Sequence, residues 1–330
     1  MKKLSVILSV LAILCVILTA VSCGESTATT AGTTETTAPV ITTAQATTPA
    51  SVTTTAPITT TTAQVTTTTP VTTTSAPAKK PDPDMSPVSK VLSVSSALKK
   101  KTFSASNGLN LPYRIYVPED YSEDYAYPVV VLLHGAGERG SDNQSQLVHV
   151  VRNFFSDTAS PFYHAIVIVP QCPANMQWVD TPWANGSYNV DSVPISKPMT
   201  AVVELLDSII ETYSVNTDRQ YVTGLSMGGF GTWDLLMRFP DRFAAAIPYC
   251  GAADPTKADI LKNIPIYTFH DTTDTSVPVT GTQAVVAAIK AAGGTQITYV
   301  ETSQYGHNVW TPGVQTPGLF EWLFSQRKDK

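Results

Sequence analysis

The stretch "QYVTGLSMGGFGTWDLLMRF", residues 220–239, places one serine among glycines where an apolar run gives way to a helical pattern. Its segment "GLSMG" fits the pattern G-x-S-x-G between a predicted strand and a predicted helix, which is the context in which this pattern presents a nucleophilic serine. Such a turn strains the backbone at Ser226, and neighbours with side chains would clash there. Gly224, Gly228 and Gly229 remove that crowding. The stretch therefore predicts a strand, a sharp turn that exposes the Ser226 hydroxyl, and a closely packed helix.

Short apolar runs recur along the rest of the chain, with helical spacing between them. The runs are continuous, which is typical of strands buried on both faces, and they predict strands at residues 127–135, 165–170, 220–226, 244–251, 264–271 and 296–302. Helices are expected at residues 199–213, 228–239 and 281–294. This alternation predicts the α/β class, with a mostly parallel central sheet and helices on both faces. Upstream, "KKTFSAS" and "NLPYRIYVPE" predict an antiparallel pair at one edge.

The N-terminal 85 residues differ in composition from the rest. Residues 1–23 have the features of an export signal, and "LTAVSC" resembles a bacterial lipobox, which predicts lipidation of Cys23 and a cell-surface tether. Simple secretion is the alternative. From residue 24 to residue 80, 25 of 57 positions are threonine, so we expect residues 24–85 to form a disordered Thr/Pro-rich linker. Residues 86–330 are long enough for one domain with a substantial core.

Composition also bears on partners and cofactors. The net charge of −5 and the lack of a basic cluster argue against nucleic acid as a partner. No CxxC pair or HExxH motif occurs, so no metal and no other cofactor is expected. Cys172 and Cys250 each follow an apolar run, which favours two buried thiols over a disulfide. We expect a monomer that contacts the membrane only through its lipid.

A serine hydroxyl needs a base, and the base needs an orienting acid. His307, in "QYGHNVW", follows the last predicted strand and is the candidate base, whereas His270 lies inside the preceding strand and is expected to pack at its end. The loop "HDTTDTSVPV" offers two acids. Asp274 lies deeper in the loop and is preferred, while Asp271 is expected to cap backbone N–H groups of a local turn.

The oxyanion of an acyl-transfer intermediate needs two N–H donors. The N–H of Met227, directly after the serine, is one candidate. The other is the N–H of Ala136, which the glycines of "LLHGAGERGSDN" would bring toward the reacting carbonyl. His134, in the same loop, is expected to be structural.

The long insertion at residues 171–198 should lie above the carboxyl ends of the strands, where ligands bind. It holds Gln171, Trp178, Trp183 and Tyr188; the aromatic side chains are candidates to stack on a sugar ring or an aromatic acyl group. The alternative for one or two of them is packing of the insertion itself. Gln171 is expected either to orient the loop at residues 132–143 that carries Ala136, called here the oxyanion loop, or to bind substrate. Trp310 is a further candidate wall of the site.

Taken together, "LHGAGERG", "VPQCP", "YVTGLSMGGFGTWD", "FHDTTDTSVPV" and "YGHNVW" resemble the α/β-hydrolase superfamily. They are most similar to secreted bacterial esterases of the prolyl-oligopeptidase-like and feruloyl-esterase-like group. The resemblance covers residues 100–326 and implies a catalytic triad of Ser226, Asp274 and His307, with oxyanion donors at Ala136 and Met227. One departure is Asp271, which stands where that group usually has glycine.

These features predict an extracellular serine esterase that acts on ester groups of plant polysaccharide or its fragments, of the feruloyl or acetyl type. A serine peptidase of the prolyl-oligopeptidase-like type is the alternative enzyme, although no acidic specificity pocket can be recognised in the sequence. A non-catalytic binding module is the alternative from another class, and it is disfavoured because all three triad residues are present.

Overall fold

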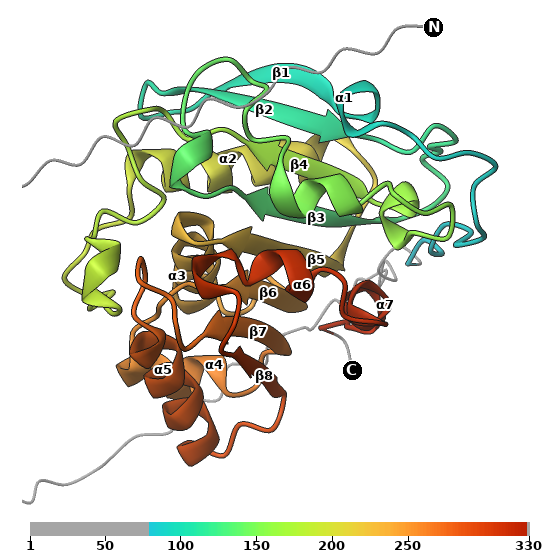
Figure 1. The fold of residues 1–330 in the computed structure, drawn as a ribbon. Coiled ribbons are helices and arrows are strands. Elements are labelled where there is room, and N and C mark those ends of the chain that lie inside the picture. The colour runs from blue at the N-terminus through green and yellow to red at the C-terminus, as the bar shows by residue number, and fades with distance from the viewer. Residues whose placement is uncertain (1–78, 329–330) are drawn as a thin grey trace, which may run out of the picture. The chain divides into compact units, whose positions relative to one another are not determined.

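The computed structural model describes residues 79–328, which form one α/β domain around a single sheet of eight strands (Figure 1). The strands are β1 Lys99–Ser104, β2 Asn110–Tyr116, β3 Tyr127–Leu133, β4 Ile166–Pro170, β5 Val215–Leu225, β6 Ala245–Tyr249, β7 Ile266–Asp271 and β8 Ile297–Thr302. Their order is β1-β2-β4-β3-β5-β6-β7-β8. Strands β1, β2 and β4 pair antiparallel and all other neighbours pair parallel. The predicted parallel sheet with an antiparallel pair at one edge is confirmed.

Helices cover both faces of the sheet, but in an uneven way. The helices are α1 Val94–Ala97, α2 Lys197–Thr212, α3 Met227–Arg238, α4 Ala258–Leu261, α5 Val279–Ala291, α6 Trp310–Gly313 and α7 Leu319–Ser325. The three helices expected from sequence, α2, α3 and α5, share one core cluster with Val129 and Val131 of β3. Val130 and Leu132 point to the other face and pack with residues of α6, α7 and short 3-10 turns. These short elements lack a long helical repeat, so the sequence did not reveal them.

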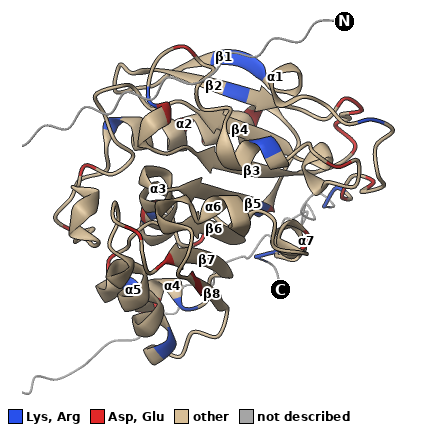
Figure 2. Ribbon diagram, in the orientation of Figure 1, with Lys and Arg blue, Asp and Glu red and all other residues tan. Residues whose placement is uncertain are grey.

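Positive charge protects one edge of the sheet. Strand β1 lies at one edge and carries Lys99, Lys100 and Lys101, all exposed, and Figure 2 shows this edge in blue. Lysines on an edge strand oppose pairing with a second chain because their charges would have to approach one another. Elsewhere Figure 2 shows acidic and basic residues interspersed along the described part of the chain.

The ordered domain begins earlier than the predicted boundary at residue 86. The carbonyl oxygen of Pro81 accepts a hydrogen bond from the N–H of Ala126 at 2.9 Å. The carboxylate of Asp82 lies 3.3 Å from the guanidinium of Arg219 and also pairs with Arg327. Residues 81 and 82 therefore belong to the domain, because Asp82 supplies countercharge to an arginine that is almost fully buried. The export signal, Cys23 and residues 24–78 of the linker lie outside the described residues.

None of the helices within residues 79–328 combines the length and the apolar character needed to cross a membrane.

The turn from β5 to α3 brings backbone segments closer together than side chains would permit. Ser226 has φ 55° and ψ −119°, a combination that costs a non-glycine residue roughly 1–3 kcal/mol and must be imposed by its surroundings. A Cβ atom at Gly228 would lie 1.9 Å from the carbonyl oxygen of Leu133, and one at Gly229 would lie 2.3 Å from that of Tyr249. Helix α3 thus rests directly on the ends of β3 and β6, which explains the glycines around the serine.

We predict that Gly228→Ala lowers the free energy of unfolding by at least about 3 kcal/mol, since the added methyl group meets fixed backbone of a central strand. Urea denaturation of the purified variant would measure the loss. Gly137→Ala is the matched control, because a Cβ atom there has no neighbour within 4 Å, and its stability should change by less than about 1 kcal/mol. Equal stability of the two variants would show that the close approach at Gly228 does not constrain the fold.

Candidate active site

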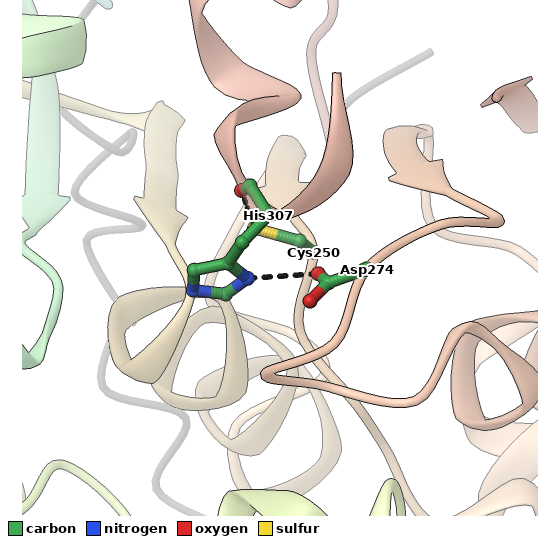
Figure 3. Close-up of side chains that lie close together, drawn as sticks. All are labelled: Cys250, Asp274 and His307. Atoms are coloured by element: carbon green, nitrogen blue, oxygen red, sulfur yellow. Dashed lines mark hydrogen bonds and ion pairs between the residues drawn. The ribbon is translucent and has the colours of Figure 1, made fainter. Parts of the chain in front are cut away.

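Three polar side chains meet at the carboxyl ends of β5, β7 and β8. Ser226 follows β5 directly, Asp274 lies in the loop after β7, and His307 lies in the segment after β8. The His307 Nε2 atom is 2.8 Å from the Ser226 Oγ, and its Nδ1 atom is 2.8 Å from the Asp274 Oδ2. Figure 3 shows the imidazole ring of His307 with its bond to Asp274. The structure thus brings together the three residues that the sequence singled out.

These contacts assign the proton positions on His307. The Asp274 carboxylate can only accept, so Nδ1 carries the hydrogen and Nε2 is free to accept the hydroxyl proton of Ser226. Burial of the Asp274 side chain tends to raise its pKa, but hydrogen bonds from His270, from His307 and from the N–H groups of Val277 and Ser276 outweigh burial and hold the pKa well below its usual value. Asp274 therefore stays ionised and keeps His307 in the tautomer that a base requires.

Asp271 does more than the local capping that we expected. Its Oδ1 accepts hydrogen bonds from the N–H and hydroxyl of Thr273, as a turn-forming aspartate does. Its Oδ2 also accepts from the Thr302 hydroxyl at 2.6 Å and from the N–H groups of Gln304 and Tyr305, each at 2.9 Å. One buried carboxylate therefore links the loop that carries Asp274 to the segment that carries His307.

His270 also contacts the acid. It is fully buried at the end of β7, as expected, with Nδ1 2.7 Å from the Thr282 hydroxyl. Its Nε2 atom lies 3.1 Å from the carbonyl oxygen of Val277 and 3.2 Å from the Asp274 Oδ2. Sequence reasoning missed this second contact, because it depends on how the loop folds back over the strand end. His270 and His307 thus lie on the same carboxylate oxygen.

The two candidate oxyanion donors each lie at the start of a helical turn. Met227 is the first residue of α3, and the Ser226 side chain does not cap that helix. Ala136 begins a 3-10 turn that likewise has no side-chain cap. Among the described residues neither N–H has an acceptor. Both Ala136 and Ser226 line the same pocket, so two unused donors are available near the hydroxyl.

His134 holds the oxyanion loop in place through hydrogen bonds of both ring nitrogens. Its Nε2 accepts a hydrogen bond from the N–H of Cys172 at 2.9 Å, so its Nδ1–H donates to the carbonyl oxygen of Gly135 at 2.6 Å. Burial lowers the pKa of His134 to about 4, which keeps the ring neutral near pH 7. The expected structural role of His134 agrees with this geometry.

Two of the residues expected to bind substrate are instead buried supports. Gln171 is fully buried; its amide accepts from the N–H of Asn143 at 2.7 Å and donates to the carbonyl oxygen of Glu138 at 3.1 Å. Trp178 is also fully buried, and its indole N–H donates to the carbonyl oxygen of His134 at 2.9 Å. Both hold the oxyanion loop and neither can reach a ligand, so the prediction that they bind substrate is wrong. Of the two roles considered for Gln171, only orientation of the loop is compatible with the structure.

The serine opens into a pocket of about 260 Å³. Trp183 and Trp310, both expected near substrate, line it together with His307. The Trp310 ring meets the His307 ring edge to face, with centroids 5.3 Å apart. Tyr188 does not take part, because it is buried and donates to Asp234. The pocket also has a polar side that sequence reasoning missed, formed by Glu138 and His149, whose closest atoms are 3.4 Å apart.

Cys250 lies behind the triad, and Figure 3 shows it beside Asp274 and His307. Ligand atoms of these three residues lie within 4.8 Å of one another, a spacing that a metal ion could use. Their polar atoms already have other partners, however: the Cys250 thiol donates to the carbonyl oxygen of His307, and the Nδ1 of His307 bonds to Asp274. Burial raises the pKa of the Cys250 thiol well above its usual value, which opposes the thiolate that a metal needs. Cys172 and Cys250 are both free and buried, which confirms the expectation of two thiols.

Comparison with known proteins identifies relatives of the chain. The Esterase family model matches residues 104–310. Feruloyl esterase B of Thermothelomyces thermophilus is 29% identical over 166 residues, which are 48% of this chain and 50% of that one. Acetylxylan esterase A of Emericella nidulans is 25% identical over 158 residues, 47% of this chain and 46% of the relative. The chain thus spans about half the length of these two relatives.

Solved structures extend the comparison. A thermostable esterase is 36% identical with a TM-score of 0.62, over 70% of this chain and 64% of that one. Two more distant structures share the fold. A ferulic acid esterase is 17% identical with a TM-score of 0.53, over 69% of this chain and 98% of that one. The acylaminoacyl peptidase of Pyrococcus horikoshii is 13% identical with a TM-score of 0.50, over 69% of this chain and 41% of that one. The sheet topology, the strained serine turn and the family match lead to one conclusion: the chain has the α/β-hydrolase fold and belongs to the Esterase family.

Proposed function

We propose that the protein hydrolyses carboxylic esters with Ser226 as nucleophile, His307 as general base and Asp274 as the acid that orients it. The observation that carries this proposal is the position of His307, bonded at 2.8 Å on one side to Ser226 and at 2.8 Å on the other to Asp274. The side chain of Asp274 is buried, whereas His307 and Ser226 line an open pocket. A substrate carbonyl can therefore reach the hydroxyl without displacing the pair behind it.

The geometry supports a two-step acyl transfer. The Nε2 of His307 takes the Ser226 proton as Oγ attacks the ester carbonyl carbon, and the resulting imidazolium is stabilised by Asp274. The imidazolium then gives its proton to the leaving alcohol as the C–O bond breaks. Water, activated by the same nitrogen, releases the acid from the acyl-serine. His307 returns to its starting tautomer because Asp274 still accepts from Nδ1.

Charge that develops on the carbonyl oxygen would be stabilised by the N–H groups of Met227 and Ala136. The N-terminus of α3, a helix of twelve residues, adds partial positive charge beside it. Each such donor is typically worth about 3–4 kcal/mol of transition-state stabilisation. The loop that carries Ala136 is fixed by Gln171 and Trp178, so the donor is in place before substrate arrives.

The proposed substrates are esters borne by plant polysaccharide or its fragments, of the feruloyl or acetyl type. Two relatives, a feruloyl esterase and an acetylxylan esterase, support this class, and the Trp183 and Trp310 side chains give the pocket aromatic walls. Peptidase activity is the alternative; the acylaminoacyl peptidase among the solved structures shares only the fold. No observation in the pocket favours a peptide.

Placement outside the cell belongs to the same proposal. Cys23 would carry the lipid, and the Thr/Pro-rich linker would hold the domain away from the membrane. An enzyme on such a tether meets polymers that cannot enter the cell.

We predict that Ser226→Ala lowers kcat/KM at least about 10³-fold on every substrate that the protein hydrolyses. The panel is p-nitrophenyl acetate, methyl ferulate, acetylated xylan and a proline-containing anilide. Ser192→Ala, which removes an exposed hydroxyl elsewhere, should leave all rates unchanged. Substantial activity in the Ser226 variant would rule out the triad, and turnover of the anilide without the esters would favour the peptidase.

Asp271→Asn should lower kcat by roughly 10- to 100-fold, because the side chains of the triad would no longer be aligned for attack on the carbonyl. KM should stay within about twofold, because the residues that line the pocket are unchanged. The amide has one acceptor oxygen in place of two, so one of the two loops must be released. Active-site titration, which counts the catalytically competent molecules, separates this effect from simple instability. Asp259→Asn, at an exposed position, is the control. An unchanged kcat would show that Asp271 does not position the triad.

Stability should fall in acid. Burial tends to raise the pKa of Asp271, but hydrogen bonds from Thr273, Thr302 and Tyr305 bring it well below the usual value, and the pKa of Asp274 is lowered likewise. The folded protein therefore binds fewer protons than the unfolded chain, so its free energy of unfolding decreases as pH drops below about 4, near the ordinary pKa of aspartate. Urea denaturation between pH 7 and pH 3 would measure this. Asp271→Asn should flatten the dependence and Asp259→Asn should not; identical curves for the two would contradict the assignment.

A further inference from the structure

A second hollow lies next to the catalytic pocket and shares one wall with it. Its volume is about 390 Å³, and it is lined by Gln177, Asp180, Thr181, Pro182, Trp183 and Ala184. Trp183 also lines the catalytic pocket. We call this hollow the outer groove. The indole of Trp183 therefore stands between the serine and a surface that the proposed ester chemistry does not use.

The side chains of the outer groove combine an apolar floor with unused polar groups. The indole ring, the ring of Pro182 and the methyl group of Ala184 are apolar. Gln177 and Asp180 are at least partly exposed, and among the described residues their side chains make no hydrogen bond. Sugar rings match this combination: their C–H faces pack on the electron-rich face of an aromatic ring, while their hydroxyls bond to amides and carboxylates at the edge.

Trp183 is held in place before any ligand binds. The guanidinium of Arg139 lies over its ring, 5.8 Å from the centroid. Arg139 is itself fixed, since it donates to the carbonyl oxygen of Ala136 at 2.8 Å and to that of Met176 at 3.3 Å. The indole is thus coupled to the oxyanion loop. A platform whose rotamer is already fixed loses little entropy on binding.

The segment that carries the platform is also docked tightly. The turn Trp183–Asn185 ends at Gly186, which has φ 63°. A Cβ atom at Gly186 would lie 3.0 Å from Pro278, and one at Gly281 would lie 1.6 Å from the carbonyl oxygen of Gly186. The segment therefore rests on the start of α5, close to the loop that carries Asp274. Its distance from the triad is set by backbone contact.

We propose that the outer groove binds a sugar unit of an uncharged polysaccharide, next to the unit whose ester lies at Ser226. Trp183 would contact the bound chain, with Gln177 and Asp180 bonding to its hydroxyls. The charge of Asp180 disfavours anionic polymers such as polygalacturonate. This inference rests on the proposed ester hydrolysis and adds to it that the substrate ester is carried on a neutral sugar chain.

Binding can be tested without catalysis. The full chain with Ser226→Ala is titrated with xylotetraose, which has no ester, and with an oligogalacturonate of the same length, by calorimetry. We expect saturable binding of xylotetraose and at least fivefold weaker binding of the anionic sugar. The double variant Gln177→Ala/Asp180→Ala should weaken xylotetraose binding at least fivefold. Asn175→Ala, an exposed residue of the same insertion outside the groove, should not. No binding, or equal binding by the double variant, would overturn the inference.

A kinetic measurement separates this inference from the proposed function. In the active protein, the ratio of kcat/KM on acetylated xylan to that on p-nitrophenyl acetate should fall at least fivefold with the double variant and stay constant with Asn175→Ala. If the double variant hydrolyses both substrates with an unchanged ratio, the proposed sugar binding in the outer groove is wrong and the proposed esterase activity stands. If the parent protein hydrolyses neither substrate, the proposed esterase activity is wrong, and the titration with xylotetraose still tests sugar binding in the outer groove.

Discussion

The contact between helix α3 and the ends of β3 and β6 is the constraint on which the rest of the site depends. The helix approaches so closely that Cβ atoms at Gly228 and Gly229 would overlap carbonyl oxygens of those strands. The chain passes from β5 into this helix through a turn with positive φ at Ser226. The strain is sustained because the turn is bonded on both sides: the Ser226 N–H donates to the carbonyl oxygen of Tyr249, and the Ser226 carbonyl accepts from Phe230.

With the position of Ser226 determined by this turn, the order of strands in the sheet determines which residues lie near it. Parallel strands end at the same edge, so residues that follow β7 and β8 meet those that follow β5. Adjacency of strands alone does not produce distances of 2.8 Å. The loops after β7 and β8 are joined by the Asp271 carboxylate, which bonds to Thr273 on one side and to Thr302, Gln304 and Tyr305 on the other. Asp271 is thus a cross-link between the loop that carries Asp274 and the segment that carries His307.

The sequence was sufficient for features that rest on local pattern. Continuous apolar runs predicted the parallel strands, and three long helical repeats predicted α2, α3 and α5. The grouping of Ser226, Asp274 and His307 followed from strand order. What it could not supply depends on contacts between distant segments. Gln171 and Trp178 have the composition of ligand-binding residues, and only the fold shows that both are buried under the oxyanion loop. His149 lies in no quoted motif, and "LHGAGERG" contains Glu138 without indicating that its side chain lines the pocket. Short helices such as α6 and α7 have too few turns to show a period.

The insertion at residues 171–198 combines buried supports of the oxyanion loop with one wall of the pocket. Two residues of its first part are buried: Trp178 bonds to His134, and Gln171 bonds to the backbone of the loop that carries Ala136. Its second part is at the surface, where Trp183 reaches the pocket. Arg139 connects the two parts with each other and with the oxyanion loop, since its guanidinium lies over Trp183 and bonds to the carbonyl oxygens of Met176 and Ala136. The aromatic wall at Trp183 and the backbone that carries the candidate oxyanion donor are therefore linked through one arginine, so a displacement of one would shift the other.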